Sequence, residues 1–287
     1  MSNLTVRIIS AMVMALVGFS GLILNSTSRW VVITAILSLG AWEFSRMVST
    51  KLNGPRASWI PAVLVLLFAL PQLSDFSTFL SGLAAFPGLV KSPLGTWVAG
   101  ISVLCVLETT LVGFRYVAIE SLAPWIYLEL FGCAYFGLYA AAVFSLVKSE
   151  IGWSGIFPLL LVQLAMATAD TGAYITGKAF GKNKLCPTIS SGKTVEGAIG
   201  GTILTTLLVL GLGNKLLGTD WVQNLGLGLL LSGTAILGDL FISVLKRYTG
   251  FKDSSKLIPG HGGVLDRFDS LLFSAPVAVF YLQLFKP

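Results

Sequence analysis

Charge is scarce in this sequence. Only 11% of its 287 residues are Asp, Glu, Lys or Arg, whereas 55% are hydrophobic. A soluble domain is typically about 25% charged and has nowhere to bury so much apolar surface. Mostly apolar windows of about 20 residues, the length that crosses a hydrocarbon core, recur along the whole chain. The composition excludes an ordinary soluble fold and predicts an all-α, polytopic transmembrane helical bundle.

Cysteine and histidine are also rare. Cys105 and Cys133 lie in apolar stretches and Cys186 lies in a basic segment, an odd count without metal-ligand spacing. A disulfide scaffold and a zinc site are therefore not expected. The single histidine, His261, lies among glycines that allow a phosphate to approach the backbone closely. A lone loop histidine is more often solvated or hydrogen-bonded than a catalytic base.

Nine segments are apolar and long enough to be membrane spans. The third is short and contains two prolines, and a further apolar stretch follows it, so eight or ten spans are alternatives. Glycines at positions 197 and 201 form a G-x-x-x-G pattern in the seventh span, which predicts a close helix–helix contact. The nine predicted spans are 4–24, 30–48, 60–73, 97–114, 122–147, 156–177, 195–217, 221–245 and 264–285.

Basic residues divide unevenly between the two sides of such a bundle. With nine spans, fourteen of the nineteen Lys and Arg residues fall on the side of the N-terminus. The positive-inside rule then predicts a cytosolic N-terminus, a C-terminus on the opposite side, and two basic loops in the cytosol.

Seven carboxylates lie in or beside the predicted spans, where an unpaired charge is costly. Glu43, Glu108 and Glu129 stand alone on spans with few other polar groups, so structural and functional roles both remain open for them. The other four gather near the predicted cytosolic ends of three spans, beside the basic loops. They are Asp170, Asp239, Asp266 and Asp269.

The spacing of these acids favours a cation site. Asp266 and Asp269 are three residues apart, so both project from one side of a helix. Oxygen ligands without His or Cys suit Mg²⁺, which is completed by waters and substrate phosphates. One interpretation of the nearby lysines and arginines is that they bind a polyanionic substrate. The other, of equal weight, is that they only mark the cytosolic face and bind anionic lipids. These cations are Lys182, Lys193, Lys246, Arg247, Lys252, Lys256 and Arg267.

One phosphate-binding motif is incomplete. Residues 192–194 read Gly-Lys-Thr, as at the end of a P-loop, but Pro187 stands where that motif needs glycine. No buried strand precedes the motif, so a Walker-type nucleotide site is excluded.

Two stretches resemble the phosphatidate cytidylyltransferases. Residues 238–243, 245–247, 252–254 and 257–270 match the signature of that family at about thirty positions with fixed spacing. Residues 170–201 add a D-T-G-A-Y segment, a G-K-A-F-G-K loop and an S-S-G-K-T-V-E-G segment. The resemblance covers roughly residues 165–275, and the N-terminal half resembles the family only in its hydrophobic spans. We therefore expect N-terminal helices over 1–95, middle helices over 96–178 and a catalytic region over 179–287.

Three positions depart from the pattern of the family. Ser191 and Val195 stand where many relatives have Pro and Trp, and these changes should affect loop shape rather than chemistry. Ile242 stands where many relatives have Glu, which argues only against a role for a glutamate there.

The resemblance implies that CTP and phosphatidate react to give CDP-diacylglycerol and pyrophosphate, with Mg²⁺, alone or with a second metal ion, as cofactor. It also implies a bacterial inner-membrane protein whose partners are the lipid bilayer and a second copy of itself, without nucleic acid. The implied metal ligands are Asp239, Asp266 and Asp269, with Asp170 as a fourth candidate whose rival role is structural. Lys246 joins the three acids in catalysis. The implied substrate-binding residues are Lys182, Lys193, Thr194, Ser243, Arg247, Lys256, His261 and Arg267.

Two other functions need the same kinds of residue. A CTP-dependent lipid kinase would use the same acids and nucleotide, but would transfer the γ-phosphoryl group and release CDP. An ion-coupled transporter would use intramembrane acids as a cation relay. The sequence shows no inverted repeat, and its acids gather at one face instead of the midplane, which disfavours transport.

Overall fold

The computed structural model describes three parts of the chain. These are residues 9–54 with gaps at 11, 14, 15, 17, 19, 24 and 25, residues 111–147 except 114, and residues 154–285. The chain divides into two compact units. The first unit is Met1–Ala141 with Thr249–Asp266, and the second is Ala142–Tyr248 with Arg267–Pro287.

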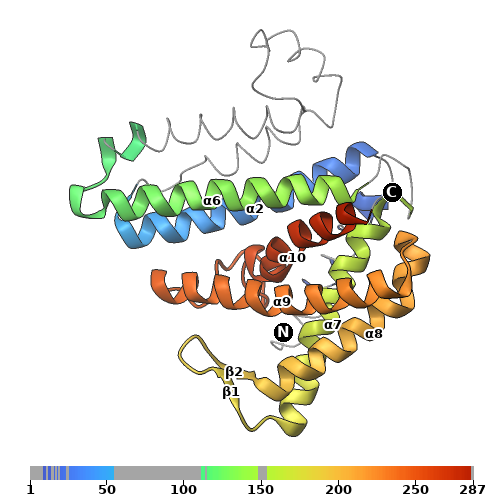
Figure 1. Ribbon diagram of the computed structural model, residues 1–287. Coiled ribbons are helices and arrows are strands. Elements are labelled where there is room, and N and C mark those ends of the chain that lie inside the picture. The colour runs from blue at the N-terminus through green and yellow to red at the C-terminus, as the bar shows by residue number, and fades with distance from the viewer. Residues whose placement is uncertain are drawn as a thin grey trace. The chain divides into compact units, whose positions relative to one another are not determined.

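Long helices make up most of the described structure, and one short antiparallel hairpin interrupts them (Figure 1). In chain order the elements are α2 (Ser26–Leu52), α6 (Ile119–Leu146), the 3₁₀ turn η1 (Ser154–Ile156), α7 (Phe157–Phe180), β1 (Lys184–Cys186), β2 (Ser190–Thr194), α8 (Val195–Leu217), α9 (Trp221–Thr249) and α10 (Leu265–Leu284).

In the first unit, α2 and α6 run side by side, and each helix offers a glycine to a phenylalanine of the other (Figure 1). A methyl group on Gly132 would lie 2.4 Å from the Phe44 ring, and one on Gly40 would lie 3.3 Å from the Phe136 ring. The two rings meet edge to face with centroids 5.8 Å apart. Small residues thus let two aromatic helices approach closely, as apolar packing in a membrane requires.

In the second unit, α7 and α8 pack through glycines. A methyl group on Gly201 would lie 2.6 Å from the Ala169 carbonyl oxygen, and one on Gly197 would lie 2.7 Å from the Ala173 carbonyl oxygen. The two backbones therefore touch where the G-x-x-x-G pattern predicted a helix–helix contact, and that prediction is confirmed.

The second unit also contains α9 and most of α10, and these two helices also pack closely at a glycine. A methyl group on Gly238 would lie 2.9 Å from both the Asp269 carbonyl oxygen and Phe273 Cβ. At the other end of the pair, the Tyr281 hydroxyl donates to the Gln223 carbonyl at 3.1 Å. Gly238 thus brings the residue after it, Asp239, beside the start of α10.

The basic segment after α7 forms a hairpin, although the sequence suggested only a loop. Its strands pair Lys184 with Thr194 and Cys186 with Ser190. Pro187 follows Cys186 in the connecting turn, where its fixed φ is favourable, and the Ile189 amide donates to the Cys186 carbonyl at 3.2 Å. β2 leads directly into α8, so the basic hairpin is anchored to that helix.

Four described helices are long and apolar enough to cross a membrane: Ser28–Leu52, Phe157–Phe180, Val195–Leu217 and Trp221–Thr249. They match four of the predicted spans, and α6 and α10 are helical where two more were expected. The polytopic helical bundle is thus confirmed in outline. Segments 60–73 and 97–110 and parts of 4–24 lie outside the described residues, so the count of nine stays a prediction.

The outer face of α8 has the character of a lipid-facing surface. Ile199, Ile203 and Leu207 recur every fourth residue and are each more than half exposed. The glycines at positions 197 and 201 are buried against α7. A helix that packs one narrow stripe of glycines and exposes an apolar stripe suits a bilayer better than water.

Adding one methyl group to α8 should have opposite effects at two glycines. At Gly201 the new Cβ must displace the backbone of α7, which costs about 1–3 kcal/mol. At Gly211 nothing lies within 4 Å, and alanine stabilises a helix by roughly 0.5–1 kcal/mol relative to glycine. Thermal unfolding of the detergent-purified protein should therefore show a lower Tm for Gly201→Ala and an unchanged or higher Tm for Gly211→Ala. Equal shifts in the two variants would contradict the glycine contact.

Candidate functional site

Three of the predicted acids gather in the second unit. Asp239, in α9, forms an ion pair with Lys193, near the end of β2. Asp170, just past the middle of α7, and Asp269, near the start of α10, lie within electrostatic range of Asp239 and of each other. Three helices thus supply a cluster of acids, and β2 adds the lysine that pairs with one of them.

Further cations surround the same cluster. Arg267 and Lys193 lie within electrostatic range of Asp170, and Lys246 lies within range of Asp269. The Lys193 and Asp239 side chains are 24% and 28% exposed, so water reaches the ion pair. Ion pairs that are open to water contribute little to stability. The pair is therefore better suited to exchange partners with a ligand than to hold the fold together.

Two predicted substrate-binding residues have structural contacts here. The Thr194 hydroxyl is buried and accepts a hydrogen bond from the Gly197 amide at 3.1 Å, so it caps the N-terminus of α8. The Ser243 hydroxyl points to Asp239 Oδ1 across 3.4 Å, which is a long hydrogen bond. Asp269 Oδ1 accepts from the Ser270 amide at 2.7 Å. The sequence did not indicate these local bonds.

Asp266 lies in the first unit and organises the loop before α10. Its Oδ2 atom accepts hydrogen bonds from the Ser254 amide at 2.8 Å, the Ser254 hydroxyl at 3.0 Å and the Gly263 amide at 2.9 Å. Gly262, with φ of 83°, passes so close that a methyl group on it would lie 2.7 Å from the same oxygen. Asp266 therefore has a structural task, in addition to the metal-binding role that the sequence suggested.

His261 lies in a turn of the same loop, which an isolated bridge between Ile258 and Gly262 closes. Its Nδ1 atom forms a hydrogen bond with the Ser10 hydroxyl at 2.8 Å, and that hydroxyl also donates to the Pro259 carbonyl at 2.9 Å. The N-terminal segment thus contacts the predicted substrate-binding loop, a contact without any signal in the sequence.

The structure adds a residue that the sequence left undecided. Glu43, in α2, is fully buried and its carboxylate accepts four hydrogen bonds from residues 254–265. Glu129, in α6, has a different partner, because its Oε1 atom accepts from the Ser45 hydroxyl of α2 at 2.9 Å. Glu108 lies outside the described residues. The sequence could not distinguish Glu43 from Glu129, whereas the fold shows that Glu43 binds residues 254–265.

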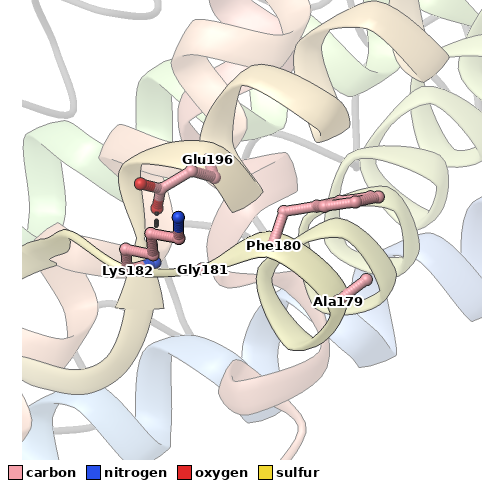
Figure 2. A pocket seen from close by; sticks show the side chains of 5 residues that line it. All are labelled: Ala179, Phe180, Gly181, Lys182 and Glu196. Carbon is pink, nitrogen blue, oxygen red and sulfur yellow. Dashed lines mark hydrogen bonds between the residues drawn. The ribbon is translucent and has the colours of Figure 1, made fainter.

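An open hollow lies where α7 ends and the hairpin begins. Ala179, Phe180, Gly181, Lys182 and Glu196 line it (Figure 2). Glu196 accepts hydrogen bonds from the Lys182 amide at 3.1 Å and from the Asn183 side-chain amide at 2.8 Å. The Lys182 side chain is exposed beside the hollow, and Arg247, Lys256 and Arg267 are exposed as well.

These features define a class of protein: a helical membrane protein that collects carboxylates and cations in a water-accessible cluster. The chain belongs to the cytidylyltransferase family, whose model matches residues 5–285. The match includes the N-terminal half, which in the sequence showed only hydrophobic spans.

Three relatives extend over most of the chain, and each is named phosphatidate cytidylyltransferase. The protein of Synechocystis is 35% identical over 99% of this chain and 98% of its own length. The Pseudomonas aeruginosa protein is 34% identical over 94% of both chains. The Staphylococcus aureus protein is 35% identical over 79% of this chain and 90% of its own.

The cap at Thr194 gives a test of how that residue acts. Thr194→Ala removes the acceptor of the Gly197 amide and should lower the stability by about 1 kcal/mol. Thr194→Ser keeps the hydroxyl and should unfold close to the wild-type temperature. The control is Thr202→Ala in the same helix, because that hydroxyl donates only to the Ala198 carbonyl of its own helix. Equal stability of Thr194→Ala and wild type would show that the cap is unimportant.

Proposed function

We propose that this chain catalyses the transfer of the cytidylyl group from CTP to phosphatidate, giving CDP-diacylglycerol and pyrophosphate. The observation that carries the proposal is the ion pair of Lys193 and Asp239, flanked by two further acids, in a chain of the cytidylyltransferase family. The names of three relatives that match most of the chain support the choice of substrates.

The reaction joins two polyanions. A phosphate oxygen of phosphatidate attacks the α-phosphorus of CTP, and the bond from that phosphorus to the oxygen bridging the α- and β-phosphates breaks. Pyrophosphate leaves with the bonding electrons. The main barrier is the repulsion between the two substrates, which fixed positive charges reduce. Lys193, Lys246 and Arg267 lie around the acids and are the cations we assign to this task.

We propose Mg²⁺ as the cofactor, held by Asp239 and Asp269 with Asp170 nearby. Among the described residues, no three His, Cys, Asp or Glu side chains are placed to hold a metal unaided. Mg²⁺ needs only one or two carboxylates when waters and substrate phosphates complete its shell. The ammonium group of Lys193 against Asp239 supports the fit, because it puts a cation at that carboxylate. A bound Mg²⁺ would supply charge neutralisation for the departing pyrophosphate.

The roles of the remaining predicted residues follow from their contacts. Asp266 stays a predicted metal ligand, and we propose that its first task is to order the loop that contains His261. Thr194 caps the start of α8, and its substrate-binding role stays a prediction. A substrate-binding role stays a prediction for the exposed or half-exposed residues, which are Lys182, Ser243, Arg247, Lys256, His261 and Arg267.

We also propose a bacterial inner-membrane location with the acidic cluster facing the cytosol. The distribution of Lys and Arg supports this placement, because with nine spans it predicts a cytosolic N-terminus and an external C-terminus. A homodimer stays a prediction. The glycines at positions 197 and 201 pack inside one copy of the chain, so they do not support an interface between copies.

Neutralising the clustered acids should abolish cytidylyl transfer. Asp239→Asn and Asp269→Asn keep the shape of the side chain and remove its charge. We expect each to reduce formation of CDP-diacylglycerol at least about 100-fold, because the charges that act on the reacting phosphates are lost. The measurement uses purified protein, phosphatidate, Mg²⁺ and CTP labelled at the α-phosphorus, with EDTA as the metal-free arm.

The matched control is Asp220→Asn, an exposed acid at the opposite end of α9 that accepts from the Gln223 amide at 2.8 Å. It should keep activity within about twofold, since surface substitutions away from such a site have small effects. Full activity of Asp239→Asn would contradict the assignment of the site. In a parallel assay with CTP labelled at the γ-phosphorus, transfer of that label to the lipid, with CDP as product, would instead identify a lipid kinase.

The orientation can be tested with a residue of the hairpin. Cys186 lies in β1 and is partly exposed. In a Cys105→Ser, Cys133→Ser background, a membrane-impermeant maleimide should label Cys186 in inverted membrane vesicles and leave it unlabelled in intact spheroplasts. The control is the same experiment after detergent solubilisation, which should label both preparations. Labelling in intact spheroplasts would place the hairpin outside the cytosol and overturn the orientation.

A further inference from the structure

Glu43, in α2, carries a carboxylate that accepts four hydrogen bonds. Its side chain is fully buried. Oε1 accepts from the Ser255 hydroxyl at 2.6 Å and from the Val264 amide at 3.0 Å. Oε2 accepts from the Ser254 hydroxyl at 2.8 Å and from the Leu265 amide at 2.7 Å. Each oxygen therefore binds one hydroxyl and one backbone amide.

These four donors come from the two ends of one segment, residues 254–265, which carries part of the signature. The two serines lie at its start, and the two amides lie where α10 begins. One carboxylate thus joins both ends of the segment. Asp266 reinforces the closure from within, because its Oδ2 accepts from Ser254 and from Gly263.

The start of α10 needs such an acceptor. The first amides of a helix have no partner within the helix, and they form its positive end. A Ser, Thr, Asp or Asn at the preceding position normally supplies an oxygen, but here that position is Val264. Glu43, from another helix, accepts from the amides of Val264 and Leu265, at the cap position and the first helical residue. An unpaired amide at a buried site would cost free energy.

The contact also explains a glycine. A methyl group on Gly263 would lie 2.5 Å from Glu43 Oε2 and 2.0 Å from the Ser254 hydroxyl. No other residue type would let the chain pass so close to the carboxylate. Gly263 and Glu43 are thus two parts of one contact.

We propose that Glu43 is a positioning residue for the cytidylyl transfer. It fixes the first turn of α10, the helix that carries Asp266 and Asp269, and it closes the segment with His261. This inference rests on the proposed function in one respect only, namely that Asp266 and Asp269 serve the reaction. Glu43 itself does not touch substrate.

Glu43→Gln is the sharpest variant, because glutamine has the same shape. Its amide nitrogen is a donor and cannot accept a hydrogen bond from a backbone amide. One of the amides of Val264 and Leu265 therefore loses its acceptor. The matched control is Glu129→Gln, which changes a buried carboxylate of α6 that accepts from the Ser45 hydroxyl.

Hydrogen exchange followed by mass spectrometry tests the contact without any substrate or metal. In Glu43→Gln, peptides that contain residues 263–266 should exchange at least about tenfold faster than in wild type, because a protecting hydrogen bond is lost. The same peptides should be unchanged in Glu129→Gln. Unchanged exchange in Glu43→Gln would overturn the proposal.

Kinetics test whether the contact serves the reaction. For folded Glu43→Gln, kcat should fall at least about tenfold, and the Mg²⁺ concentration for half-maximal activity should rise several-fold, as happens when support of metal ligands is lost. A variant that is only less stable would keep the wild-type Mg²⁺ dependence. Faster exchange with an unchanged kcat and Mg²⁺ dependence would make Glu43 merely structural and overturn the positioning role.

A milder pair of variants covers the case in which Glu43→Gln fails to fold. Ser255→Ala removes one donor to Glu43, and Ser45→Ala removes the donor to Glu129. Only Ser255→Ala should raise the Mg²⁺ requirement and speed exchange at residues 263–266, and identical behaviour of the two would overturn the proposal. Absence of CDP-diacylglycerol synthesis by the wild type would refute the proposed function, while the exchange experiment would still decide the contact.

Discussion

The cost of an unpaired charge in an apolar surrounding governs the polar structure of this protein. Three of the described acids show how that cost is met by hydrogen-bond donors or a cation. Asp239 has Lys193, Asp266 has the amides of its loop, and Glu43 has two serines and two amides. The buried carboxylate of Glu43 thus joins α2 to residues 254–265, and such specific contacts matter because apolar packing alone gives little preference for one neighbour over another in a membrane.

Much of this could be predicted from the sequence. Long apolar windows give the helices directly, and acids beside basic loops indicate where the polar groups gather. The clustering of Asp170, Asp239 and Asp269 follows from their positions near the ends of three spans, and the G-x-x-x-G contact follows from residue size. These inferences succeed because they depend on length, spacing and charge, which are local properties of the chain.

Other features could not be predicted, because they depend on partners distant in sequence. Glu43 and Glu129 look alike on their spans, and only the fold shows that one of them binds a segment more than two hundred residues later. Thr194 looked like part of a phosphate-binding motif, yet its hydroxyl caps a helix. Glutamate and threonine are each compatible with several roles. The residues that they contact in the fold show which hydrogen bonds they make, and the sequence alone does not give those contacts.

The separation between Glu43 and its donors has a consequence for biogenesis. Ser254 and Leu265 follow Glu43 by 211 and 222 residues, so at about 5–20 residues per second they are synthesised roughly 10–45 s after it. During that interval α2 has been synthesised, but the residues that donate hydrogen bonds to Glu43 have not. Completion of residues 254–265 therefore also marks the moment at which α2 can acquire the four hydrogen bonds to Glu43.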